Sequence, residues 1–242
     1  MTLPPTSAQT PIVVAMDFDN SADCIRLAKQ LNPNYCRLKV GKELFTAAGP
    51  ALVESLRELG FEIFLDLKFH DIPNTVAKAI KATMNLDIWM VNVHASGGLK
   101  MLEAAKEAVE STASNTPLLI AVTVLTSMSA EDLLGVGIQK TPQEQVIHLA
   151  SLAEAARLDG VVCSALEAPV LKSSFGENFV CVTPGIRPEG SSTDDQQRIM
   201  TPAKALANGS DYLVIGRPIT QAASPAQACE TIFQSLNVNT QV

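Results

Sequence analysis

The chain has 242 residues, of which 47% are hydrophobic and 18% charged, and this composition excludes an intrinsically disordered protein. Its 18 Lys and Arg against 25 Asp and Glu give a formal net charge of −7. An acidic chain without a run of Lys or Arg lacks the electrostatic footprint of a nucleic-acid or anionic-membrane binder, so a few well-placed cations must bind any anionic ligand.

The five cysteines are scattered and show no C-x-x-C spacing, which argues against a disulfide framework and a zinc site. Cys36, Cys163 and Cys181 lie in apolar runs, where a thiol usually packs as a small hydrophobic side chain. Residues 1–11 carry neither the basic nor the apolar region of a secretory signal. No run of about 18 apolar residues occurs, so we expect a cytoplasmic protein without a membrane span.

Eight short β-type runs alternate with helical stretches along the chain. The predicted strands are 12–17, 35–40, 62–68, 88–94, 118–125, 160–164, 179–184 and 212–217. Ser21 is predicted to cap the first helix, and Pro50 to lie in the first turn of another. Two further helices are predicted, one after Gly97 and one from Thr141.

Strict alternation of strand and helix predicts a parallel sheet, since parallel neighbours need a crossover connection. Eight such units of roughly 30 residues favour an α/β fold of the (β/α)8 TIM-barrel type over an open doubly wound sheet. The first strand is followed by DFDNSAD rather than G-x-G-x-x-G, which also disfavours a dinucleotide-binding fold. We expect a single barrel domain over 1–242, with 1–10 as a loose N-terminal extension.

Charged residues occur where buried barrel strands should be apolar. Asp17 ends the first predicted strand, Lys39 lies near the end of the second, and Asp66 and Lys68 end the third. Side chains two apart on a strand share a face, so these charges should project into the C-terminal mouth of the barrel, where barrel enzymes have their active sites. The alternative is a buried ion-pair network, which has a high desolvation cost.

Lys68 lies between two carboxylates in the sequence, Asp66 and Asp71, which favour its ammonium form. A charged lysine is a poor Schiff-base nucleophile but suits proton donation or stabilisation of a developing anion. The pattern therefore predicts chemistry that generates a carbanion and then protonates it.

A second group of residues predicts an anion site. Gly216 and Arg217 close the eighth predicted strand, and Arg187 and Gln196 lie in the long polar segment 184–202, after the seventh. These positions match the phosphate site of TIM barrels and favour a phosphorylated small molecule. The alternatives are a surface loop without function and an ordinary surface arginine. His70 and His94 form no metal-binding motif, and no metal is expected.

The segment DLKFHDIPNT (66–75) resembles the signature of the orotidine 5'-phosphate decarboxylase family. Companion motifs occur in the expected order: AMDFD, LKVG, VNVHASGG, TVLTSM, VTPGIRP, DQQRIMTP and VIGRPIT. The resemblance covers nearly the whole chain and implies cofactor-free decarboxylation of orotidine 5'-monophosphate to UMP, the last step of de novo pyrimidine synthesis.

The resemblance also implies a role for each matching residue. Lys68 would protonate C6 of the pyrimidine, Asp66 would lie beside the departing carboxylate, and Lys39 and Asp71 would complete an alternating charged array. The segment from Asp71 to Thr75 would reach into the site of a neighbouring subunit, which implies a homodimer.

The remaining implied contacts bind the substrate. Asp17 and Lys39 would bind the ribose hydroxyls and Thr126 the pyrimidine ring, while Gln196, Arg187, Gly216 and Arg217 would hold the phosphate as a lid closes. Two other functions stay open: a related phosphosugar lyase such as a hexulose-phosphate synthase, which would need Mg²⁺, and a non-catalytic nucleotide-binding barrel.

Overall fold

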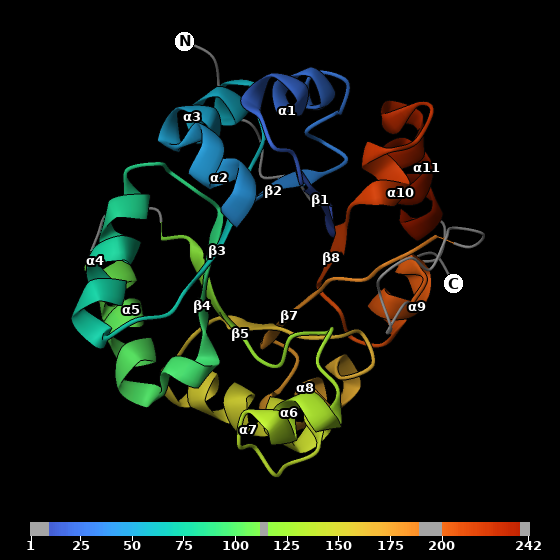
Figure 1. The fold of residues 1–242 in the computed structure, drawn as a ribbon. Coiled ribbons are helices and arrows are strands. Elements are labelled where there is room, and N and C mark those ends of the chain that lie inside the picture. The colour runs from blue at the N-terminus through green and yellow to red at the C-terminus, as the bar shows by residue number, and fades with distance from the viewer. Residues whose placement is uncertain (1–9, 112–115, 189–199, 238–242) are drawn as a thin grey trace.

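A computed structural model describes residues 10–111, 116–188 and 200–237, and it confirms the predicted (β/α)8 barrel. Eight parallel strands pair in chain order, and β8 closes on β1 (Figure 1). The strands are β1 (Ile12–Ala15), β2 (Arg37–Gly41), β3 (Ile63–Phe69), β4 (Met90–His94), β5 (Leu118–Val122), β6 (Gly160–Val162), β7 (Val180–Thr183) and β8 (Tyr212–Ile215).

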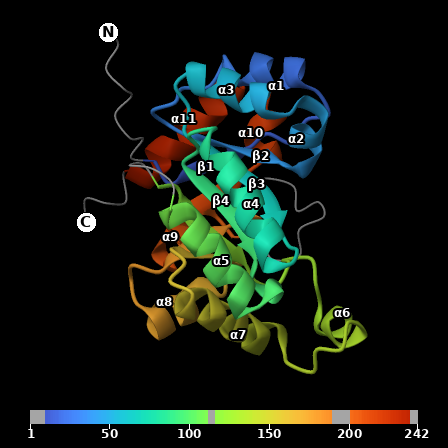
Figure 2. The same ribbon diagram turned by 90° about the vertical axis from the view of Figure 1, so that its left-hand side faces the viewer.

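The helices surround the strands, and α6 stands apart from the rest of the ring (Figure 2). The helices of the described residues are α1 (Ser21–Ala28), α2 (Lys42–Ala48), α3 (Pro50–Glu58), α4 (Pro73–Met84), the 3-10 turn η1 (Ala95–Gly97), α5 (Leu99–Glu110), α6 (Ala130–Gly135), α7 (Pro142–Ala155), α8 (Ala168–Phe175), α9 (Pro202–Ala207), α10 (Arg217–Thr220) and α11 (Pro225–Asn237).

Helix starts follow the local sequence signals, with one correction. Pro50 lies in the first turn of α3, and Thr141 caps α7 in a capping box with Glu144. Ser21 is not the cap of α1: the Asn20 side chain accepts from the backbone N–H of Asp23 at 2.9 Å instead. Asn and Ser are equally good caps, so composition alone does not separate two adjacent candidates.

The strands present two faces, as side-chain alternation requires. Outward residues such as Leu38 and Val40 pack fully buried against the helices, while inward residues fill the barrel. The apolar interior cluster consists of Val13, Ala15, Phe64, Met90, Ile120, Val182 and Val214. Lys39 shares the inward face and lies above this cluster, at the C-terminal end of β2. The barrel interior is thus filled with apolar side chains in its lower part and carries charged side chains at the C-terminal mouth.

The opposite end of the barrel is closed around Arg37. Its guanidinium lies 4.2 Å from the centre of the Trp89 ring, and its Nε donates to Glu62 at 2.7 Å. Thr10, assigned by the sequence to a loose extension, is buried here, and its hydroxyl donates to the Tyr35 carbonyl at 2.7 Å. Thr10 is therefore packed against the barrel, because this hydrogen bond joins it to the segment that precedes β2.

All five cysteines are free and buried, which confirms the core assignment of Cys36, Cys163 and Cys181. In the part of the chain that the structure describes, no helix is both long and apolar enough to cross a membrane.

Candidate active site

The C-terminal mouth of the barrel holds a cavity of about 630 Å³, a size typical of small-molecule sites. Most of the predicted site residues line it: Asp17, Lys39, Asp66, Lys68, Thr126, Arg187, Gly216 and Arg217. Asp71 and Thr75 are exposed and do not line this cavity. Gln196 lies outside the described residues.

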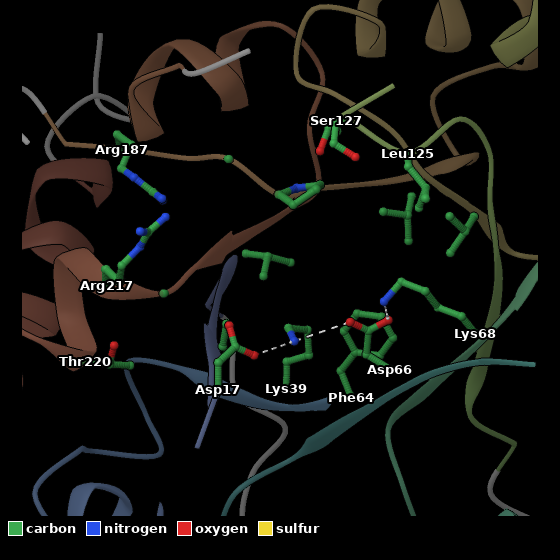
Figure 3. A pocket seen from close by; sticks show the side chains of 18 of the residues that line it. Asp17, Lys39, Phe64, Asp66, Lys68, Leu125, Ser127, Arg187, Arg217 and Thr220 are labelled. Atoms are coloured by element: carbon green, nitrogen blue, oxygen red, sulfur yellow. Dashed lines mark hydrogen bonds and ion pairs between the residues drawn. The ribbon is translucent and has the colours of Figure 1, made fainter. Parts of the chain in front are cut away.

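Four of these side chains form a row of alternating charge along one wall of the cavity (Figure 3). The ammonium of Lys39 lies 3.2 Å from the Asp17 carboxylate and 3.3 Å from that of Asp66. The other oxygen of Asp66 accepts from the Lys68 ammonium at 2.5 Å. Gly41 leaves room for this row, since a Cβ there would lie 3.3 Å from the Lys39 nitrogen.

The central pair of the row is ionised at neutral pH. Burial opposes the charge of Asp66, but Lys39 and Lys68, helped by hydrogen bonds from Lys68 and Asn92, hold its pKa below the usual range. Burial also opposes the charge of Lys39, but the negative charges of Asp66 and Asp17 outweigh this effect and raise the pKa of Lys39. A ligand therefore meets one fixed charge of each sign at the buried pair Lys39 and Asp66, where the charges act more strongly than in water.

Asn92 belongs to this wall, and the sequence analysis did not identify it. It is fully buried on β4, donates from its amide nitrogen to Asp66 at 2.7 Å, and accepts the backbone N–H of Lys68 at 2.8 Å. The signal was present, because Asn92 is a polar residue at an inward position between Val91 and Val93.

Lys68 has an unusual backbone. Its φ is +52°, in the left-handed region that non-glycine residues rarely occupy, and the β3–β4 register shifts between Leu65 and Phe69. Such a conformation costs about 1–3 kcal/mol and persists where surrounding contacts enforce it, which is typical of active sites. The irregular end of β3 thus directs the Lys68 side chain towards Asp66.

The opposite side of the cavity carries two arginines that point towards one another (Figure 3). Arg217 begins α10 directly after Gly216, and Arg187 follows β7 and is 7% exposed. The backbone N–H of Arg187 donates to the backbone carbonyl of Met200 at 3.0 Å, and this hydrogen bond joins the two ends of the segment after β7. Two converging guanidinium groups offer N–H donors of the kind that bind phosphate and carboxylate groups.

Apolar side chains fill the wall between the charged row and the arginines. Phe64, Val122, Val124, Leu125 and Val162 line this part of the cavity. Thr126 and Ser127 add hydroxyl groups beside it, and Ser127 is a lining residue that the sequence analysis did not name. A flat ring with polar edges fits such a surface.

A second cavity, of about 410 Å³, adjoins the charged row from the side of β2 and α2. Lys39, Asp66 and Lys68 line both cavities, and Lys42 and His94 line only the second. The charged row is therefore accessible from two directions.

His94 lies at the edge of the second cavity, and its ring centre is 5.6 Å from that of His70. Burial lowers the pKa of His94 to about 4, with further contributions from His70, Lys42 and Lys68. The His94 ring is thus neutral at pH 7 and adds no charge to the wall. Among the described residues, no three His, Cys, Asp or Glu side chains form a group that could hold a metal ion.

The substitution Asp66→Asn is expected to lower the free energy of unfolding at pH 7 by about 3 kcal/mol, because it leaves the buried Lys39 and the partly buried Lys68 without their shared carboxylate. The pKa of Asp66 is depressed, so this stability is present above about pH 4 and is lost as the pH falls through the lower folded-state value. The difference in the free energy of unfolding between Asp66→Asn and wild type should therefore become smaller in acid. Urea unfolding at several pH values measures this difference.

The matched control is Asp87→Asn, which removes the more exposed carboxylate paired with Arg57. The urea midpoint of Asp87→Asn should differ from that of wild type far less than the midpoint of Asp66→Asn does. Equal destabilisation by both variants would contradict a special role for the charge of Asp66.

Comparison with known proteins gives consistent matches along the chain. The sequence profile described as "Orotidine 5'-phosphate decarboxylase / HUMPS family" matches residues 10–232. A protein of Teredinibacter turnerae named orotidine 5'-phosphate decarboxylase is 60% identical over 225 residues, which cover 93% of this chain and 97% of that one. One of Pseudomonas putida W619 with the same name is 59% identical over 231 residues, 96% of this chain and 99% of that one.

Solved structures agree with these sequence matches. The crystal structure of orotidine 5'-phosphate decarboxylase from Lactobacillus acidophilus superposes with a TM-score of 0.84 at 40% identity, over 94% of this chain and 99% of that one. A crystal structure of an uncharacterized conserved protein from Geobacillus kaustophilus gives 0.81 at 41% identity, over 94% of this chain and all of that one.

Proposed function

The chain belongs to the orotidine 5'-phosphate decarboxylase / HUMPS family, and we propose that it decarboxylates orotidine 5'-monophosphate to UMP without a metal or cofactor. The observation that carries the proposal is the row Asp17–Lys39–Asp66–Lys68, which faces Arg187 and Arg217 across one cavity. The names of the relatives that are about 60% identical favour the decarboxylase branch of the family over a hexulose-phosphate synthase.

In the reaction, the bond between C6 and the carboxylate breaks, CO₂ leaves, and the electron pair stays on C6. That pair lies in the plane of the ring and cannot delocalise into the π system, so the barrier is very high. The Lys68 ammonium stabilises the charge that appears only in the transition state and then gives its proton to C6. Solvent reprotonates Lys68, while Asp66 lies beside the departing carboxylate.

The other lining residues bind the substrate. Asp17 and Lys39 bind the ribose hydroxyls, and Thr126 binds the pyrimidine edge beside the apolar wall. Arg187 and Arg217 hold the phosphate with Gly216, whose lack of a side chain lets the backbone approach it. Gln196, to which the resemblance also assigns a phosphate contact, lies outside the described residues.

We further propose a homodimer in which Asp71 and Thr75 of each subunit complete the site of the other. Within one chain, the Asp71 carboxylate accepts a hydrogen bond from the backbone N–H of Ile72, the next residue, at 2.6 Å. The second cavity beside Lys39 and Lys68 offers space and positive charge for a carboxylate from outside. Ile72 is 66% exposed, which fits burial of this segment against a second copy.

Mixing two inactive variants tests this shared site. Asp71→Ala and Lys68→Ala homodimers should each be nearly inactive, and subunit exchange should restore activity. A random 1:1 mixture contains about a quarter of the wild-type number of intact sites, because each mixed dimer has one intact site out of two. Recovery near that fraction is the expected result, and no recovery in mixed dimers verified by native mass spectrometry would contradict the shared site.

The proposed activity is tested by following the ultraviolet absorbance of orotidine 5'-monophosphate in the presence of EDTA. Loss of substrate with formation of UMP supports the decarboxylase. Turnover of a sugar phosphate that requires Mg²⁺ would point to the phosphosugar lyase instead. Binding of UMP without turnover would point to a nucleotide-binding barrel.

A cytoplasmic location is also part of this proposal. All five thiols are free, as is usual in a reducing compartment, and Cys24, Cys36, Cys163, Cys181 and Cys229 are buried in the core.

A further inference from the structure

The amide of Asn92 joins the two residues that the proposed reaction places at the scissile bond. Its nitrogen donates to the carboxylate oxygen of Asp66 that also accepts from the Lys68 ammonium, and its oxygen accepts the backbone N–H of Lys68. Asn92 is fully buried on β4, whereas its two partners belong to the end of β3. One side chain therefore connects the neighbouring strand to both groups.

We propose that Asn92 is the positioning residue of the site, which fixes the Asp66 carboxylate and the left-handed backbone of Lys68 as one rigid unit. The proposal rests on the decarboxylase function proposed above. Asn92 does not line either cavity at the charged row, so it acts through its two partners rather than on the substrate.

Hydrogen bonding fixes the orientation of the amide. The Lys68 N–H is a donor and must meet the Asn92 oxygen, and the ionised Asp66 is only an acceptor and must meet the nitrogen. No other residue type of this size offers a neutral donor and a neutral acceptor at these two positions. An apolar residue would leave a backbone N–H and a carboxylate oxygen of the buried wall short of a partner.

The geometry at Lys68 explains why such a contact is needed. With φ at +52°, the backbone is held in a conformation that an unsupported lysine would leave. At the register shift in the β3–β4 pairing, the Asn92 oxygen accepts the Lys68 N–H. A displacement of about 1 Å at a reacting group can cost about 100-fold in rate, so this support has a direct kinetic consequence.

Two substitutions separate positioning from packing. Asn92→Ala removes both hydrogen bonds and should lower kcat by about 100-fold, while the Kd of UMP changes less than about threefold. Asn92→Asp keeps the acceptor for the Lys68 N–H and loses the donor to Asp66 when the new carboxyl is ionised.

Protonation of that new carboxyl restores a donor towards Asp66. The ratio of Asn92→Asp to wild-type kcat should therefore rise about tenfold as the pH falls from about 8 to about 5. The charged and titratable groups that face this position are Lys39 from β2, Asp66 and Lys68 from β3, and His94 from β4. Loss of packing alone would give a ratio that does not depend on pH.

A kcat of Asn92→Ala within threefold of wild type, or a pH-independent ratio for Asn92→Asp, would overturn the inference. If wild type itself does not decarboxylate orotidine 5'-monophosphate, the proposed function fails, and a crystal structure of Asn92→Ala still tests the positioning role. The expected result there is that Lys68 leaves the left-handed region and Asp66 rotates. An unchanged Lys68 and Asp66 would refute the role of Asn92 independently of activity.

Discussion

Replacing Lys68 with alanine is expected to lower kcat by about 10⁴- to 10⁷-fold. General acid catalysis typically contributes about 10²- to 10⁴-fold, and one preorganised electrostatic contact about 10²- to 10³-fold. Lys68 supplies both effects at the same carbon in the proposed mechanism, so the two losses multiply. The Lys68 ammonium lies 2.5 Å from one oxygen of Asp66, whereas the Lys39 ammonium lies 3.3 Å from the other.

Single-turnover measurements with excess enzyme and EDTA would detect such slow reactions. Binding of UMP should weaken less than about tenfold, because UMP carries neither the departing carboxylate nor the developing charge at C6. Lys29→Ala, an exposed lysine at the end of α1, is the control and should match wild type. A Lys68→Ala rate within tenfold of wild type would remove this residue from the mechanism.

Sequence patterns predicted all eight strands but not where each one ends. The predicted strand 118–125 stops at Val122, and beyond it the buried Val124 lines the cavity while Leu125 is 40% exposed. Likewise, the last predicted strand stops at Ile215, and Arg217 begins a helix. Hydrophobicity indicates that a residue is buried, but a ligand cavity and a helix layer bury apolar side chains alike.

The charged residues of the site were predictable because ionisable groups are rare in buried strands. Asn92 was not predicted, because an uncharged amide in an apolar run is a weaker indication of a functional residue than a charged group. Its importance follows from two contacts made across strands, to a carboxylate and to a strained backbone at Lys68. Such contacts depend on the register of β3 and β4, which local sequence does not specify.

In the proposed mechanism, the wall that carries the reacting groups is separate from the wall that binds the phosphate. The arginines face Lys68 across the cavity, so the phosphate would be held far from the bond that breaks (Figure 3). Binding energy from such a remote group can be used to close a site and to position the reacting groups, which raises kcat as well as affinity. This division predicts that the phosphate contacts matter for the rate and not only for binding.

Replacing Arg217 with alanine is therefore expected to lower kcat/KM for orotidine 5'-monophosphate by about 10²- to 10⁴-fold. A hydrogen bond to a charged group contributes about 1.5–3 kcal/mol, and a guanidinium can make two of them to one phosphate. A tenfold change corresponds to about 1.4 kcal/mol, which gives this range. Arg187→Ala should act in the same direction, since Arg187 points towards the same place (Figure 3).

The nucleoside orotidine, which lacks the phosphate, provides the internal control. If Arg217 acts on the phosphate alone, its replacement should change kcat/KM for orotidine by less than about threefold, because the lost contact does not exist for that substrate. Steady-state kinetics of wild type and Arg217→Ala, each with orotidine 5'-monophosphate and with orotidine, form a complete double-mutant cycle. An equal loss with nucleotide and nucleoside would place Arg217 outside the phosphate site and would show instead that the barrel mouth itself had been disturbed.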